Sequence, residues 1–105
     1  MEPLEVDEII YYLIQRWGKK YDFRLFKRGK YLYFQMMWGF LGQKSFPLNE
    51  DDYKKAIADK LEILNRCGYS DQVREWIKKV NSRPRLGRAV SLQLEINERM
   101  KEFLI

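Results

Sequence analysis

Residues 21–38 read YDFRLFKRGKYLYFQMMW, and apolar and polar side chains alternate in this run on each side of a basic turn. The alternation within residues 21–25 is typical of a half-buried β-strand. The segment 27–30 contains a glycine, which accepts positive φ, and it predicts a hairpin turn. The strand after the turn, 31–38, is apolar on both faces. This pattern predicts either a central strand or an outer face that is used for binding.

Helical periodicity flanks the hairpin, because apolar side chains recur every three or four residues outside it. The helical segments are 4–17, 50–66, 70–80 and the residues after Asn97. Asn49 and Ser70 are the expected N-caps of two of these helices. Residues 90–96 alternate again and predict a third strand. The order α-β-β-α-α-β-α indicates a single two-layer α+β domain over 1–105, with a three-stranded sheet built on the hairpin and helices on one face. Either edge of the hairpin could accept the third strand.

The composition argues against the common catalytic and metal sites. The 105 residues include no histidine and one cysteine. Histidine is the commonest general base and metal ligand, and one cysteine allows neither an intrachain disulfide nor a Cys-rich zinc site. The acids Glu50, Asp51 and Asp52 match no calcium loop and suit the start of a helix. We therefore predict a non-enzymatic protein with no catalytic residue, no metal and no cofactor.

The charge balance favours an acidic partner. Twenty Lys and Arg residues face fifteen Asp and Glu residues, which gives a net charge of +5. No apolar run approaches the roughly 18–20 residues of a membrane span. The first residues are acidic, unlike the basic start of a signal peptide. The sequence predicts a cytoplasmic protein.

The segment 83–88, RPRLGR, is the strongest polar feature. Arg83, Arg85 and Arg88 fall on a short loop, and the planar guanidinium group matches carboxylate or phosphate. Binding residues concentrate on such loops. The segment is predicted to bind an anion or a protein partner, or else to be a solvated connector whose arginines pair with acids of the helices.

A second basic segment, 16–30, has seven basic residues against one acid and is interleaved with aromatic residues. The candidate binding residues within it are Lys27, Arg28 and Lys30, and Trp38 at the end of the next strand joins them as a candidate. Basic groups beside aromatic rings suit single-stranded nucleic acid. The same pattern also fits core aromatics on a strand whose edge is protected by lysine.

Three further segments together resemble a known family. They read RWGKKYD (16–22), QMMW with QKSFPL (35–38 and 43–48), and RPRLGRAVS (83–91). In this order they are similar to the family catalogued as domain of unknown function 3067, small proteins of cyanobacteria and plastids. The resemblance implies a photosynthetic host and a cytoplasmic setting, or a stromal one for plastid relatives. It implies no reaction.

The sequence thus favours a protein-binding module with an assembly or regulatory role and an unidentified protein partner. The alternative is a module that binds RNA or DNA through the basic segments 16–30 and 83–88. The partner and the oligomeric state are left open.

Overall fold

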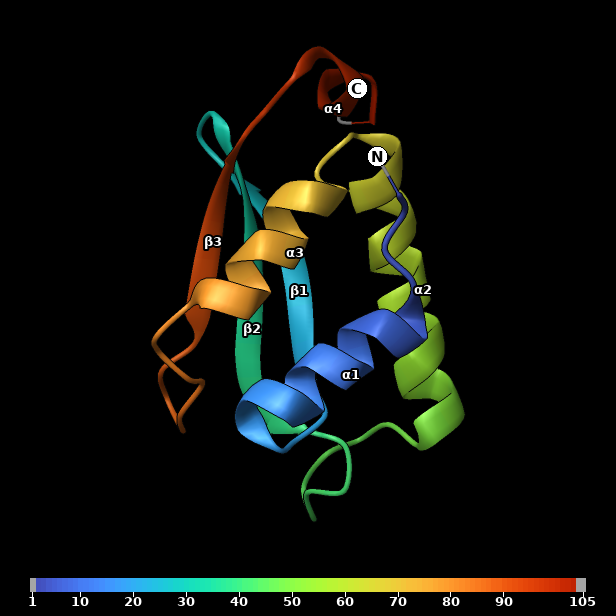
Figure 1. Ribbon diagram of the computed structural model, residues 1–105, viewed down its shortest axis with the longest axis vertical. Helices are drawn as coiled ribbons and strands as arrows, with labels where there is room; N and C mark the ends of the chain where they lie inside the picture. The colour runs from blue at the N-terminus through green and yellow to red at the C-terminus, as the bar shows by residue number, and fades with distance from the viewer. Residues whose placement is uncertain (1, 104–105) are drawn as a thin grey trace.

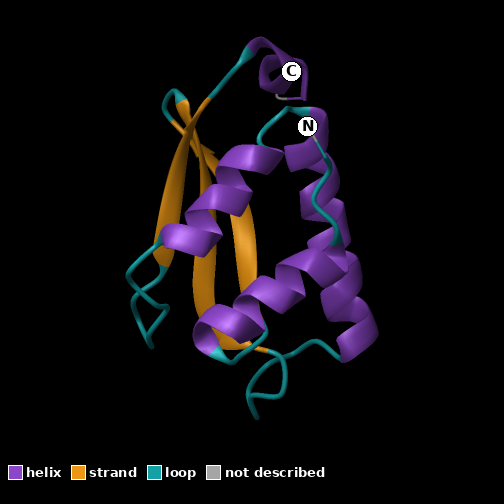
Figure 2. Cartoon of the chain, in the orientation of Figure 1, coloured by secondary structure: helices purple, strands orange, loops and turns teal. Residues whose placement is uncertain are grey.

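The computed structural model describes residues 2–103 and has the order of elements that the sequence predicts. The elements are α1 (Val6–Trp17), β1 (Tyr21–Arg28), β2 (Tyr31–Phe40), α2 (Glu50–Arg66), α3 (Ser70–Lys79), β3 (Val90–Glu95) and α4 (Glu98–Phe103). The strands form one antiparallel sheet, and α1 and α3 cross in front of it in Figure 1. Figure 2 shows the same separation into a helix layer and a strand layer. The two-layer α+β class is confirmed.

The third strand joins the second strand of the hairpin, so the sheet order is β1-β2-β3. Its register sets Leu94 opposite Leu32 and Leu92 opposite Phe34. The other edge of the hairpin, at β1, lies beside α2, which contacts β1 directly. The sequence does not show which edge of the hairpin accepts the third strand. In the structure β3 pairs with β2, because α2 occupies the place beside β1 that another strand would need.

The core lies between the helices and one face of the sheet. The rings of Phe23 and Phe34 are fully buried, and their centroids are 4.7 Å apart. Trp76 of α3 packs edge-on against Phe34 at 5.6 Å. Burial of one such side chain contributes about 1.5–3 kcal/mol. The alternation of residues 21–25 thus places every second side chain in the core.

The two ends of the hairpin differ in regularity. At one end Gly29 has a φ of 61° in a two-residue turn, which pairs Arg28 with Tyr31. At the other end the register shifts between Tyr21 and Phe23, so residues 37–39 have no partner on β1. Trp38 therefore lies in the irregular end of β2, where it is half-buried. This end of the sheet carries the candidate site.

Candidate functional site

An open cleft of about 470 Å³ lies at the irregular end of the sheet. Two loops border it, 40–46 and 83–88, and both extend from the lower end of the molecule in Figure 1. We call it the basic cleft. Its lining residues are Lys19, Tyr21, Trp38, Phe40, Gln43, Arg83, Pro84, Arg85 and Leu86. The cleft thus combines residues from the end of α1, from β1 and β2, and from the arginine loop.

The arginine loop is held in a defined shape by its backbone. Arg85 and Arg88 exchange two hydrogen bonds, N to O, of 3.0 and 2.7 Å. Between them Gly87 has a φ of 76°, which favours glycine. Pro84 is buried, whereas the arginines on either side of it are exposed. The loop therefore presents Arg83 and Arg85 at the cleft on either side of a buried proline, and the hairpin that begins at Arg85 follows.

The walls of the cleft are aromatic and its charges are all positive. The Lys19 ammonium group lies 4.3 Å from the centroid of the Phe40 ring. Tyr21 packs edge-on against Phe40 at 5.8 Å. Among the described residues, no carboxylate lines the cleft. Leu86, at the tip of the loop, is 86% exposed. The cleft therefore offers three cations, an aromatic wall and one exposed apolar side chain.

The predicted site residues do not form one surface. Trp38, Arg83 and Arg85 line the basic cleft, and the backbone of Arg88 closes the hairpin beside it. The other three candidates lie around the β1–β2 turn, at the opposite end of the sheet. These three residues are Lys27, Arg28 and Lys30.

The basic segment 16–30 divides among several roles. Arg16 donates hydrogen bonds to the carbonyl groups of Lys78 and Val80 and so caps the C-terminal end of α3. Lys20 pairs with Glu50 at 3.5 Å. Arg24, Arg28 and Lys30 lie beside aromatic rings of the sheet. The segment is therefore partly structural, and only Lys19 and Tyr21 reach the basic cleft.

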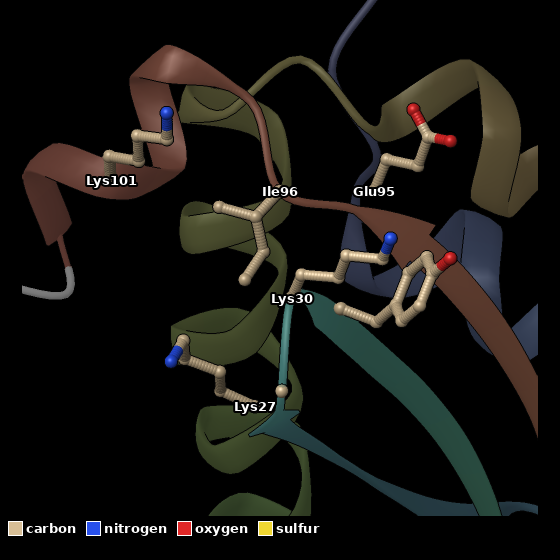
Figure 3. Close-up of a pocket in the computed structure, with 7 residues that line it drawn as sticks. Lys27, Lys30, Glu95, Ile96 and Lys101 are labelled. Carbon is tan, nitrogen blue, oxygen red and sulfur yellow. The ribbon is translucent and has the colours of Figure 1, made fainter.

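A larger hollow of about 720 Å³ lies at the turn end and is lined by Lys27, Lys30, Glu95, Ile96, Lys101 and their neighbours. Figure 3 shows that the ammonium groups of Lys27 and Lys101 extend in different directions, while Lys30 lies over Tyr31. Lys101 is paired with Glu98 at 3.0 Å. The three lysines do not converge on one point, so this hollow is the weaker candidate for an anion site.

Sequence reasoning singled out Trp38 and the arginines but did not select the other lining residues, among them Lys19, Phe40 and Leu86. Lys19 stood in the basic segment without a reason to prefer it to its neighbours, and Phe40 fell beyond the predicted strand end. The sequence did contain one sign of the exposed Leu86. This large apolar residue stands between Arg85 and Gly87, where no helical or strand periodicity predicts its burial.

Two further structural findings concern the same described part of the chain. Within residues 2–103, no three His, Cys, Asp or Glu side chains cluster in a way that could hold a metal ion. No described helix is both long and apolar enough to cross a bilayer.

Comparison with known proteins connects the chain to one family. The family model described as Domain of unknown function (DUF3067) matches residues 7–104. The solution NMR structure of the Alr2454 protein from Nostoc sp. strain PCC 7120 is 34% identical, with a TM-score of 0.84. The match covers 97% of this chain and 98% of that one. No curated protein matches the chain.

The three segments that resemble the family meet at the basic cleft. Residues 16–22 contribute Lys19 and Tyr21, residues 35–48 contribute its aromatic wall and Gln43, and residues 83–91 contribute the arginine loop. The match over residues 7–104 contains all three segments. This chain therefore belongs to the domain of unknown function 3067 family.

Proposed function

We propose that the protein is a non-enzymatic protein-binding module that holds an acidic segment of its partner in the basic cleft. The observation that carries the proposal is the lining itself, in which Lys19, Arg83 and Arg85 stand without a carboxylate beside Trp38. Arginine and tryptophan are the residues most enriched at the energetic centres of protein interfaces. The exposed Leu86 adds an apolar contact at the rim. The working place we propose is the cytoplasm of a photosynthetic cell, or the stroma for plastid relatives.

The shape of the cleft favours a peptide segment as its occupant. The cleft is lined by residues of two loops, and its aromatic wall lies next to its cations, as the contact between Lys19 and Phe40 shows. A segment with an acidic side chain beside an apolar one satisfies both parts. Guanidinium groups bind carboxylates in a bidentate geometry, which gives the arginines a role in orienting the partner as well as in attracting it.

The test is affinity purification from a photosynthetic host with three baits: the wild type, Arg85→Glu and Arg28→Glu. Arg28 is an exposed arginine at the opposite end of the sheet. Its variant also replaces an arginine with glutamate, so the two variant proteins have the same net charge and differ only in the place of the change. We expect mass spectrometry to find a partner that the wild type and Arg28→Glu retain and that Arg85→Glu loses. Equal recovery of every partner by the three baits would remove the cleft from the proposal.

One observation supports a second candidate function, binding of single-stranded nucleic acid on the open face of the sheet. Phe26 and Tyr33 stack there with centroids 5.2 Å apart, and the guanidinium group of Arg24 lies 4.8 Å from the Phe26 ring. Lys30 lies over Tyr31. Rings flanked by cations suit stacked bases and phosphates. The rings are already stacked on each other, so a base must compete with a contact that the protein makes itself.

Fluorescence polarisation with labelled oligouridine and oligothymidine distinguishes the second candidate from the first. If the open face binds nucleic acid, log affinity falls linearly with log salt. Phe26→Ala then lowers affinity more than Arg85→Glu does. Absence of binding at 50 mM salt eliminates this candidate and leaves the protein-binding proposal intact.

A further inference from the structure

A second hollow, of about 380 Å³, borders the basic cleft at the C-terminal end of α1. We call it the α1 hollow, and its lining residues are Ile14, Gly18, Lys19, Lys20, Phe40, Leu41, Gly42 and Glu50. Lys19 and Phe40 line both hollows, and the Leu41 N–H donates a 3.0 Å hydrogen bond to the Lys20 carbonyl. The end of α1 lies beside the two loops in Figure 1. The two hollows are therefore neighbours that meet at the contact between Lys19 and Phe40.

Exposed apolar side chains mark both hollows. Among residues 2–103, the large apolar side chains that are exposed are Tyr11, Ile14 and Leu86. Leu86 lines the basic cleft and not the α1 hollow, whereas Ile14 lines the α1 hollow and not the basic cleft. Single exposed apolar residues are normal on a protein surface, so the informative feature is where these two lie. They flank the shared Lys19–Phe40 contact, one in each hollow.

The charge along the two hollows is positive. The basic cleft has three cations, and in the α1 hollow Lys19 and Lys20 stand with one carboxylate, Glu50. Glu50 lies 3.5 Å from the Lys20 ammonium group and 3.6 Å from that of Lys54, so its charge is balanced within the fold. The acids at 51–52 line neither hollow. Within residues 2–103, no ion pair joins Lys19 to a carboxylate. The charge that remains complements an acidic segment.

We propose that the partner's acidic segment continues past Lys19 and Phe40 into the α1 hollow and carries an apolar residue on each side of its acids. This extension rests on the proposed function, because it starts from an acidic segment in the basic cleft. One apolar side chain lies against Leu86, and the other lies against Ile14 and Leu41. The acids between them face the cations. Nucleic acid carries negative charge but no aliphatic side chain, so the two apolar contacts favour a peptide.

The two apolar contacts give the site its selectivity. Cations attract any acidic segment and act mainly on the rate of association. An apolar side chain that matches Ile14 or Leu86 adds affinity only for the segments that have one at the right place. Ile14 and Leu86 are thus the residues that we expect to distinguish the partner from other acidic proteins.

The first experiment selects phage-displayed random peptides on the wild type, Ile14→Gln, Tyr11→Gln and Arg85→Glu. Peptides of about twelve residues reach about 40 Å when extended, which exceeds the 26 Å width of the molecule. We expect the wild type to enrich acids with an apolar residue on each side, and Ile14→Gln to keep the acids but lose one apolar position. Tyr11 is the matched control, an exposed apolar residue of α1 outside both hollows. Glutamine is a good helix former, so both variants keep the helix.

The results distinguish the extended site from the basic cleft alone. Acidic peptides that depend on Arg85 but have no preferred apolar positions show that the basic cleft binds and the α1 hollow does not. The same apolar positions on Ile14→Gln as on the wild type lead to the same conclusion. Either result overturns the extension and leaves the proposed function in place. If the wild type enriches no acidic peptides, both are overturned.

The second experiment measures the coupling by fluorescence polarisation, with the peptide that the wild type enriches most. Replacing the apolar residue that meets Ile14 with serine should lower affinity for the wild type about tenfold. The same replacement should cost Ile14→Gln little, while Leu86→Gln shows the full loss. The other apolar residue of the peptide should couple to Leu86 in the same way. Equal losses for the wild type and Ile14→Gln overturn the extension, however tightly the peptide binds.

Discussion

The ion pair between Glu8 and Arg74 ties α1 to α3, and breaking it should make stability depend on pH in a defined way. Arg74 Nε donates a 2.6 Å hydrogen bond to Glu8 Oε2, and Arg74 Nη2 donates one of 3.1 Å to Glu8 Oε1. The Tyr12 hydroxyl donates to the same carboxylate at 2.6 Å. The side chain of Arg74 is 15% exposed and that of Glu8 is 26% exposed. The pair is thus bidentate, mostly buried and supported by a third group.

The size of the effect follows from the pKa of Glu8, which the hydrogen bond from Arg74 lowers from 4.5 to about 2. A carboxyl group with a depressed folded pKa stabilises the fold fully above its unfolded pKa. That stability is lost as the pH falls from about 4.5 toward 2. Between pH 7 and pH 3 the loss amounts to about 2 kcal/mol of unfolding free energy. Glu8→Gln keeps the shape of the side chain but cannot titrate, so it lacks this part of the acid sensitivity.

The assay is urea unfolding, followed by tryptophan fluorescence, of the wild type, Glu8→Gln, Arg74→Met and the double variant at both pH values. We expect the wild type to lose about 2 kcal/mol more than Glu8→Gln between pH 7 and pH 3. The double-mutant cycle at pH 7 should give a coupling of about 1–3 kcal/mol. Equal acid losses in the two proteins, or a coupling below about 0.5 kcal/mol, would refute the assignment of Glu8 and Arg74 as a stabilising pair.

Three other features give direct predictions. Tyr53→Phe removes the hydroxyl that bonds the Tyr21 carbonyl, and we expect urea unfolding to show a loss of about 1–2 kcal/mol. Asn97→Ala removes the side-chain acceptor for the Met100 N–H, the N-cap of α4, and should cost about 1–2 kcal/mol in the same assay. Burial raises the pKa of the Cys67 thiol, so a thiol reagent at pH 8 should label it at the rate of local opening. Immediate labelling of native protein would contradict its burial.

The hairpin and the order of elements could be predicted because each rests on local periodicity. Alternation in residues 21–25 and glycine at the turn specify two paired strands, whatever else packs around them. Asn49 is confirmed as an N-cap, since its side chain accepts from the Asp52 N–H at 2.8 Å. The prediction for Ser70 was wrong. The turn after α2 is so tight, with Gly68 at a φ of 81°, that the N-cap is Tyr69 and Ser70 is already helical and buried.

The different roles of the residues in the basic segment 16–30 could not be predicted, because the number of charged residues in a segment does not show where each side chain lies in the fold. A strand of eight residues is about 27 Å long, so Lys19 and Lys30 lie at opposite ends of the sheet. The function of Arg16 depends on the end of α3, more than sixty residues away in sequence. Such long-range contacts decide whether an arginine is a structural cap or a binding group, and local periodicity does not encode them.

The hairpin of the arginine loop separates its residues along the chain. The bridge between Arg85 and Arg88 turns the chain back on itself, so Arg83 and Arg85 line the cleft on the Trp38 side. The chain then enters β3, whose free backbone groups lie on the edge away from β2. The proposed partner contact therefore uses Arg83 and Arg85. Arg85→Glu should therefore change partner recovery.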